Sequence, residues 1–337
     1  MSVVLHSNTM AAPTDTVAGP RPELDDLERY RRELTGYCYR MLGSAFEAED
    51  AVQETMVRAW KGMDSFEGRA ALRSWLYRIA TNVSLDMLRG RQRRALAMDL
   101  GPADRADSFK FATLPEHAWV QPIPNDRVIP DDGDPAEIAE ARETVRLAFI
   151  TALQRLPARQ RAVLILREVL RWQASEVAEL LETSVASVNS ALQRARATLA
   201  TQPADGEPET RATISADQQE LLTRYVDAFE RYDIESLVAL LHEDAVMSMP
   251  PYHFWLQGPT EMGAWFLGTG SGCKGSRLVA VPANGGVAFG SYRIDPDGGH
   301  APFSIQLLEV SGDRIVGHHN FLDTALFPFF GLPTHLP

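Results

Sequence analysis

Arginine clusters give this chain two short segments that could bind phosphate groups. One is the basic run between residues 89 and 94, and the other, between residues 155 and 171, carries five arginines against one acid, Glu168. Guanidinium groups hold phosphates through paired N–H donors. The whole chain has a formal net charge of −12, which argues against a protein that coats DNA through its overall charge. Local basic patches on an acidic chain indicate separate surfaces for DNA and for a protein partner.

Helical periodicity accompanies the first basic run. Between residues 70 and 89, apolar side chains recur at steps of three and four and form one stripe, which alone predicts only a helical bundle. The opposite face is polar and carries Arg78, Asn82 and Arg89. Asparagine can donate to and accept from a base edge, and arginine can hold the phosphates of a separated strand. This face is a candidate surface for single-stranded DNA.

A second helix precedes this one in the sequence. Its predicted buried stripe runs from Ala48 to Trp60, and its outer face is acidic and polar, with Asp50, Gln53 and Glu54. A rigid face of this kind can pair with basic residues of a protein partner.

The order of these features resembles region 2 of the sigma-70 superfamily, in the extracytoplasmic-function (ECF) group. The resemblance covers about residues 24–94. It implies that the face with Asp50, Gln53 and Glu54 docks on the clamp coiled coil of core RNA polymerase. It also implies that the polar helix face and the loop before it capture the −10 promoter element. The expected −10 contacts are Phe66, Arg69, Arg78, Asn82 and Arg89.

A helix-turn-helix pattern follows in residues 135–201. One helix starts near Leu156, a second covers residues 174–181, and a third begins at Val185 after a short connection. The third helix has small and polar outer residues, so it can enter the major groove. These segments resemble sigma region 4, which reads the −35 element and contacts the polymerase flap. The expected contacts are Ser187, Asn189 and Ser190 on base edges and Arg194 and Arg196 on phosphates.

This helix departs from the family pattern at two positions. Members of the family often have a basic residue where Asn189 stands and another where Ala191 stands. The departure leaves the base preference open, while the expected fold is unchanged.

Proline and acidic residues separate the two helical blocks, residues 23–96 and 135–201. Residues 97–134 contain five prolines and several aspartates, which predicts an extended acidic linker. The resemblance implies that this linker threads toward the polymerase active-site cleft. Residues 1–22 are expected to be a disordered extension, and residues 202–213 a second linker.

From residue 214 onward the pattern changes to helices followed by short strands. Turn signals such as Asn284-Gly285-Gly286 separate the strands. Two or three helices followed by a curved antiparallel sheet resemble the cone of SnoaL-like (nuclear-transport-factor-2-like) domains. The predicted fold is therefore multidomain, with two all-α domains followed by an α+β cone over residues 214–337.

Cones of this kind enclose a pocket. The residues expected to line it are Tyr252, His253, Trp255, Trp265, His318, His319 and Asp323. Some relatives use Asp/His pairs on small carbon acids. We expect instead a regulatory domain without catalytic residues, acting where a separate anti-sigma factor otherwise would and open to a small-molecule ligand. No metal is expected, because the adjacent residues His318 and His319 point to opposite faces of a strand and cannot easily bind one ion together. No cofactor is expected either.

Composition limits where the chain acts. Its two cysteines, Cys38 and Cys273, lack metal-ligand spacing, which is typical of free thiols in a reducing cytoplasm. No stretch approaches about 18 consecutive apolar residues, and the first residues lack a signal-peptide pattern. We predict a cytoplasmic, nucleoid-associated sigma factor that binds core polymerase and promoter DNA and makes no membrane contact.

Two alternatives remain from the sequence. In one, the cone is a SnoaL-like enzyme or ligand sensor, and the helical part is a ligand-gated DNA-binding regulator. In the other, the protein is an ordinary dimeric repressor with a ligand-binding domain. Two separate DNA-binding blocks favour a sigma factor, because a repressor needs only the helix-turn-helix and leaves residues 24–94 unexplained.

Overall fold

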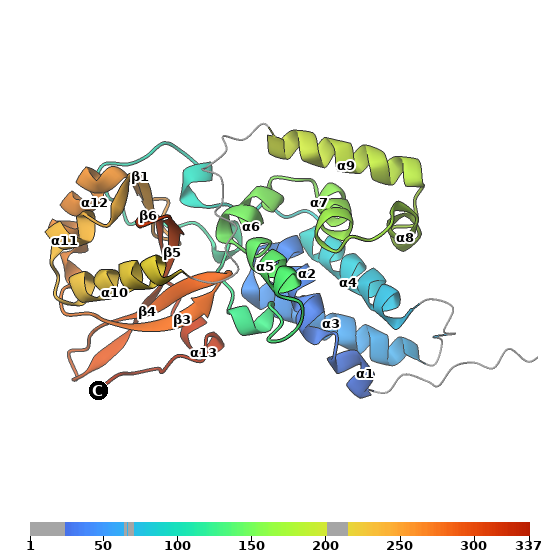
Figure 1. Cartoon of the computed structure of the whole chain (residues 1–337), viewed down its shortest axis with the longest axis horizontal. Helices are drawn as coiled ribbons and strands as arrows, with labels where there is room; N and C mark the ends of the chain where they lie inside the picture. Colours follow the sequence, from blue (N-terminus) through green and yellow to red (C-terminus); the bar gives the residue numbers. More distant parts are fainter. Residues whose placement is uncertain (1–23, 64–65, 67–70, 201–214) are drawn as a thin grey trace, which may run out of the picture.

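Thirteen α-helices and six strands form two helical units and a cone in the part of the chain that the structure describes (Figure 1). A computed structural model describes residues 24–63, 66, 71–200 and 215–337. The expected N-terminal extension, the second linker and Arg69 lie outside the described residues. No helix of the described part is long and apolar enough to cross a membrane.

The first helical unit contains α1 to α4. Its helices are α1 (Leu24–Glu28), α2 (Arg31–Leu42), α3 (Ala45–Gly62) and α4 (Leu72–Leu88). Gly43 ends α2 in the left-handed conformation that glycine adopts without strain (φ 69°), and the Ser44 hydroxyl accepts from the backbone N–H of Glu47 at the start of α3. The stripe predicted for α3 is buried except at its end, because Trp60 is 59% exposed.

The second helical unit contains α5 to α9. Its helices are α5 (Pro135–Glu143), α6 (Leu147–Gln154), α7 (Ala158–Leu164), which continues as a π-helical turn (Ile165–Val169), α8 (Ala174–Leu180) and α9 (Val185–Ala200). The α8–α9 pair forms the expected helix-turn-helix, and Val188, Leu192 and Ala195 are its buried stripe on α9. This unit packs directly on the first one, because α7 and α8 both contact α4.

Residues 97–134 connect the two helical units but do not run free as an extended linker. Their apolar side chains enter the core, where Trp119, Val120 and Ile123 are at most 2% exposed. The backbone N–H of Gln121 donates to the carbonyl of Gly43, so the linker is pinned to the first unit. The proline and aspartate content indicated a solvated chain, but a few large apolar residues are enough to fold it onto its neighbours.

The cone is a six-stranded sheet with helices on both of its faces. Its helices are α10 (Ala216–Glu230), α11 (Ile234–Val238), α12 (Gly258–Leu267) and α13 (Leu326–Phe329), and its strands are β1 (Leu241–Ser248), β2 (Trp255–Gln257), β3 (Arg277–Ala283), β4 (Gly286–Ile294), β5 (His300–Ser311) and β6 (Arg314–Phe321). The strand order is β2-β1-β6-β5-β4-β3. The antiparallel expectation holds for every pair except β1 and β6, which are parallel.

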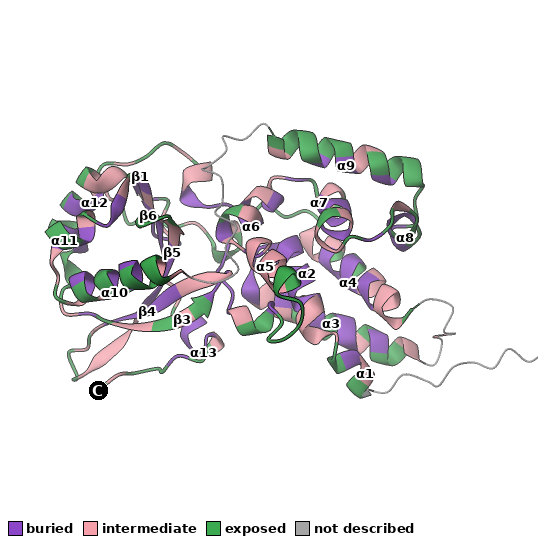
Figure 2. Ribbon diagram, in the orientation of Figure 1, coloured by how far each residue is buried: buried purple, intermediate pink, exposed green. Residues whose placement is uncertain are grey.

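One hydrophobic core joins all three units. It combines α2 to α9 with one face of the sheet and α13, where Tyr292, Leu326 and Phe327 are fully buried. Figure 2 shows buried residues in the helices of the first unit and in β4, whereas β3 is mostly exposed or intermediate. A separate core lies between the other sheet face and α10 to α12. The cone is therefore docked on the helical units through a shared interior.

Candidate polymerase and nucleic-acid interfaces

The acidic and polar face of α3 is open to solvent. Asp50, Gln53 and Glu54 are all exposed, and Glu54 forms only a local pair with Arg58, at 2.7 Å one turn along the helix. An exposed i,i+4 pair of this kind contributes about 0.3–0.5 kcal/mol, so it does not prevent Glu54 from pairing with a partner. Trp60 adds an exposed aromatic ring to the same helix.

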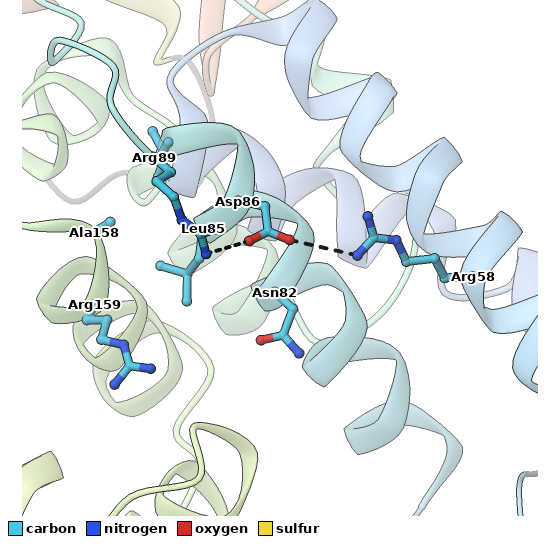
Figure 3. Close-up of a pocket in the computed structure, with 8 residues that line it drawn as sticks. Arg58, Asn82, Leu85, Asp86, Arg89, Ala158 and Arg159 are labelled. Atoms are coloured by element: carbon cyan, nitrogen blue, oxygen red, sulfur yellow. Dashed lines mark hydrogen bonds and ion pairs between the residues drawn. The ribbon is translucent and has the colours of Figure 1, made fainter.

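The polar face of α4 lines a cleft between the two helical units. The cleft has a volume of about 540 Å³, and Asn82, Arg89 and Arg159 are among its lining residues (Figure 3). Asp86 lies in its wall, 2.9 Å from Arg89 and 4.0 Å from Arg58. Three guanidinium groups therefore face the cleft with one carboxylate between them, which leaves it suited to anionic groups.

Two further residues predicted for the −10 element are engaged within the protein. Arg78 lies 3.7 Å from Glu179 of α8, and its Nε is buried with no hydrogen-bond partner among the described residues. The Phe66 ring packs on Trp75, with centroids 4.9 Å apart. Only part of the predicted −10 surface is therefore open.

An aromatic contact missed at the sequence level holds the second helical unit on α4. Trp172 is 6% exposed, and its ring centroid lies 5.1 Å from that of Tyr77. Arg73 lies over both rings and donates from Nε to Glu33 at 2.7 Å. Burial raises the pKa of Tyr77 well above its usual value, so its hydroxyl stays protonated and donates to Glu33. No local pattern marked Trp172 as a contact between units.

The outer face of α9 is exposed, in contrast to that of α4. Ser187, Asn189, Arg194 and Arg196 are exposed and Ser190 is half-buried. Arg194 donates to the Ser190 hydroxyl at 2.6 Å, and Arg196 pairs with Glu168 at 2.7 Å. Ser187, Ser190 and Arg194 lie on one flank of the exposed face of α9, whereas Asn189 and Arg196 lie on its other flank. Arg196 also has an acidic competitor for a phosphate.

Asn284, at the β3–β4 turn of the cone, joins three parts of the chain. Its Nδ2 donates to the Tyr39 hydroxyl at 2.7 Å and to the Val145 carbonyl at 2.8 Å. Its Oδ1 accepts from the backbone N–H of Ile123 at 2.9 Å. The positive φ of Asn284 (46°) and Gly285 (76°) fits the predicted tight turn. The Asn-Gly signal indicated the turn but not the partners that the amide binds.

The residues predicted to line a pocket in the cone do not form one group. His318 is 2% exposed, and its Nε2 lies 2.7 Å from the Tyr225 hydroxyl and its Nδ1 2.9 Å from Asn320. Burial lowers the pKa of His318 to about 3. Tyr252 and Trp265 belong instead to an aromatic cluster, while His253 is exposed and Trp255 is half-buried beside the linker.

His319 and Asp323 each make other contacts, and Asp323 accepts from the backbone N–H of Ala325 at 3.0 Å. His319 bonds the Ser248 hydroxyl through Nδ1 at 2.8 Å, in a different contact from that of His318. Within the described residues, no group of three or more His, Cys, Asp or Glu is placed to hold a metal ion.

Comparisons with known proteins bear on all three units. Residues 27–94 match the family described as Sigma-70 region 2, residues 146–199 match Sigma-70, region 4, and residues 222–318 match the SnoaL-like domain. The ECF RNA polymerase sigma factor SigG of Mycobacterium tuberculosis is 44% identical over 99% of this chain and 89% of its own length. The chain belongs to the ECF sigma factors.

A second relative supports the arrangement of this ECF sigma factor. The ECF sigma factor SigJ of Mycobacterium tuberculosis is 30% identical over 67% of the chain and 64% of its own length. A SigJ crystal structure covers 92% of this chain and 100% of the other, with a TM-score of 0.58 and 22% identity, which shows a similar fold. The predicted family, fold class and sigma-factor function are confirmed.

Proposed function

We propose that this ECF sigma factor binds core RNA polymerase through Asp50, Gln53 and Glu54 of α3. The proposal rests on a rigid, exposed, acidic and polar helix face that can pair with basic partner residues. The −35 element is then read by the exposed face of α9, and the −10 element by the face of α4 that lines the cleft in Figure 3. The protein acts where polymerase and promoter DNA lie, in the cytoplasm with the nucleoid.

The two promoter-reading faces must separate for this to happen. The −10 and −35 elements lie roughly 25 base pairs apart, which is about 85 Å of duplex at 3.4 Å per pair. Regions 2 and 4 are in direct contact here, through Tyr77 and Trp172 and through Arg78 and Glu179. The arrangement described above is therefore a closed form that has to open on polymerase.

We propose that the cone stabilises the closed form. The observation that carries this proposal is the Asn284 amide, which bonds region 2 at Tyr39, region 4 at Val145 and the linker at Ile123. A buried amide with both donors and its acceptor engaged is costly to leave unpaired. The ring of Phe329 extends the contact onto region 2, with its centroid 5.1 Å from that of Phe46.

The cone acts in this proposal as a control element and not as an enzyme. His318 is the best-placed histidine for acid–base chemistry, but a pKa of about 3 makes it a weak base near neutral pH. Both of its ring nitrogens are engaged by neighbouring side chains.

Run-off transcription with purified core polymerase tests the proposal on the full chain. Asn284→Asp puts a carboxylate against the Val145 carbonyl, and Gly285→Ala makes a Cβ overlap the carbonyl oxygen of Arg142. Both variants should raise transcript yield several-fold by favouring the open form. Asp313→Asn, at the exposed β5–β6 turn, is the matched control and should leave the yield unchanged. If both turn variants gave the wild-type yield, the proposed control function of the cone would be wrong. If none of the proteins gave a transcript, the proposed contacts with polymerase and promoter would be wrong.

A further inference from the structure

The linker crosses one end of the cone, where an aromatic cluster receives one of its side chains. The cluster consists of Tyr252, Phe254 and Trp265. The Phe109 ring lies edge-on to all three, with centroids 5.1, 5.0 and 5.0 Å away. Edge-to-face pairs at this spacing are favourable beyond the apolar area that they bury. Phe109 thus fills a place in the cone that is shaped for an aromatic ring.

Hydrogen bonds hold the backbone around Phe109 in the same place. We call residues 101–114 the crossing segment. The backbone N–H of Asp104 donates to the Trp255 carbonyl at 2.8 Å, and the indole N–H of Trp255 donates to the Gly101 carbonyl at 3.0 Å. The N–H of Ala106 donates to Glu261 at 2.8 Å. Ala106 is itself part of the cone interior, so the segment is bound by both its backbone and its side chains.

The crossing segment limits how far regions 2 and 4 can separate. If the cone stays docked on region 4, only about four residues, 97–100, are free between region 2 and the segment. If the cone stays on region 2, about twenty residues, 115–134, are free and reach at most roughly 70 Å when fully extended. Both lengths fall short of the roughly 85 Å between promoter elements. Release of the crossing segment from the cone therefore lengthens the reach between regions 2 and 4.

We propose that the aromatic cluster is a binding site for a small planar apolar molecule, and that such a molecule competes with Phe109 and releases the crossing segment. A ligand ring between Tyr252, Phe254 and Trp265 takes the position that the Phe109 ring occupies, so ligand binding and docking of the segment compete. The ligand thereby favours the open form of the sigma factor. This step rests on the proposed function, whereas competition at the cluster does not.

Binding of indole, with no polymerase present, tests the competition directly. Phe109→Ala empties the site, so this variant should bind indole at least tenfold more tightly than wild type by calorimetry. Lys110→Ala is the control, because Lys110 is the next residue of the same segment, is exposed and has no ring that could pack on the cluster. It should bind indole as wild type does.

Amide hydrogen exchange on the unmodified chain provides the second measurement. Saturating indole should speed exchange at Asp104, Ala106 and Leu114, whose N–H groups donate to the cone. Equal indole affinity in wild type and Phe109→Ala, or unchanged exchange at these amides with indole bound, would overturn the proposal. Neither assay involves transcription. Their results are therefore independent of the run-off results for the Asn284 and Gly285 variants, and either proposal can fail without the other.

Discussion

The Asn284 amide nitrogen lies 2.7 Å from the Tyr39 hydroxyl oxygen, 245 residues away in the sequence. Tyr39 is fully buried on α2 and donates its own hydroxyl proton to the Gln121 carbonyl at 2.8 Å. A single polar chain thus runs from the cone through region 2 to the linker. It makes the docking of the cone specific, since apolar contact alone tolerates many arrangements.

A double-mutant cycle should detect this link as a coupling free energy. Tyr39→Phe and Asn284→Gly each remove one partner, and glycine keeps the left-handed backbone at position 284. We expect a coupling of about 1 kcal/mol in the free energy of unfolding, which is typical of a buried neutral hydrogen bond. Urea unfolding of the four proteins measures it. Tyr39→Phe combined with Asp313→Ala, at a distant turn, should be additive within about 0.5 kcal/mol.

Charge reversal on α3 should weaken binding of the sigma factor to core polymerase. Asp50→Lys replaces an exposed carboxylate at the centre of the proposed docking face. We expect at least a tenfold loss of affinity, which is about 1.4 kcal/mol, in a fluorescence titration with core enzyme. The control is Asp107→Lys, an equal charge change at a carboxylate whose side chain is 75% exposed in the linker. Equal losses in both variants would indicate a general charge effect and contradict the assignment of the α3 face.

Two substitutions on α9 should separate positioning from base reading. Arg194→Ala should weaken binding of the holoenzyme to all promoters alike and reduce the salt slope by about 1, because one phosphate contact is lost. Asn189→Ala should change the preference at one or two −35 bases by about 1–3 kcal/mol and leave the salt slope unchanged. Salt titrations on single-base promoter variants measure both effects. If Asn189→Ala changed the salt slope, Asn189 would contact a phosphate, and its assignment to base reading would be wrong.

Local sequence patterns predicted most helices and strands, because their physical causes are local. The three-and-four spacing of α4 and the Asn-Gly turn before β4 both depend on near neighbours. The three-residue strand β2 and the start of β1 at Leu241 have no local pattern of this kind. Pairing of β1 with β6 decides that strand, and this contact spans more than 70 residues.

Contacts between units could not be predicted in the same way. Phe109, Trp172 and Asn284 each bind a segment far away in the sequence, and nothing in their own neighbourhood distinguishes them from solvated residues. The pocket prediction failed for the same reason. It grouped His318 with Tyr252 and Trp265, whereas packing places His318 beside Tyr225 and gives the two aromatic residues to the cluster that holds Phe109.

The stability of the cone should depend on pH through His318. Burial lowers the pKa of His318 in the folded protein to about 3, against about 6.5 in an unfolded chain. Between these values the unfolded chain binds a proton that the folded chain does not, so the free energy of unfolding falls as the pH falls. The loss should begin near pH 6.5 and reach about 2 kcal/mol from this residue at pH 5.

Urea unfolding of His318→Gln at pH 7.5 and pH 5 isolates this contribution. The variant should lose about 2 kcal/mol less than wild type between the two pH values, because glutamine does not titrate. Tyr225→Phe is the matched control: it removes the hydroxyl that contacts His318 but keeps the buried histidine. This control should be less stable at both pH values and retain the wild-type pH dependence. If His318→Gln and wild type lost the same free energy of unfolding between pH 7.5 and pH 5, His318 would not be buried as a neutral ring. The argument that His318 is a weak base would then be wrong as well.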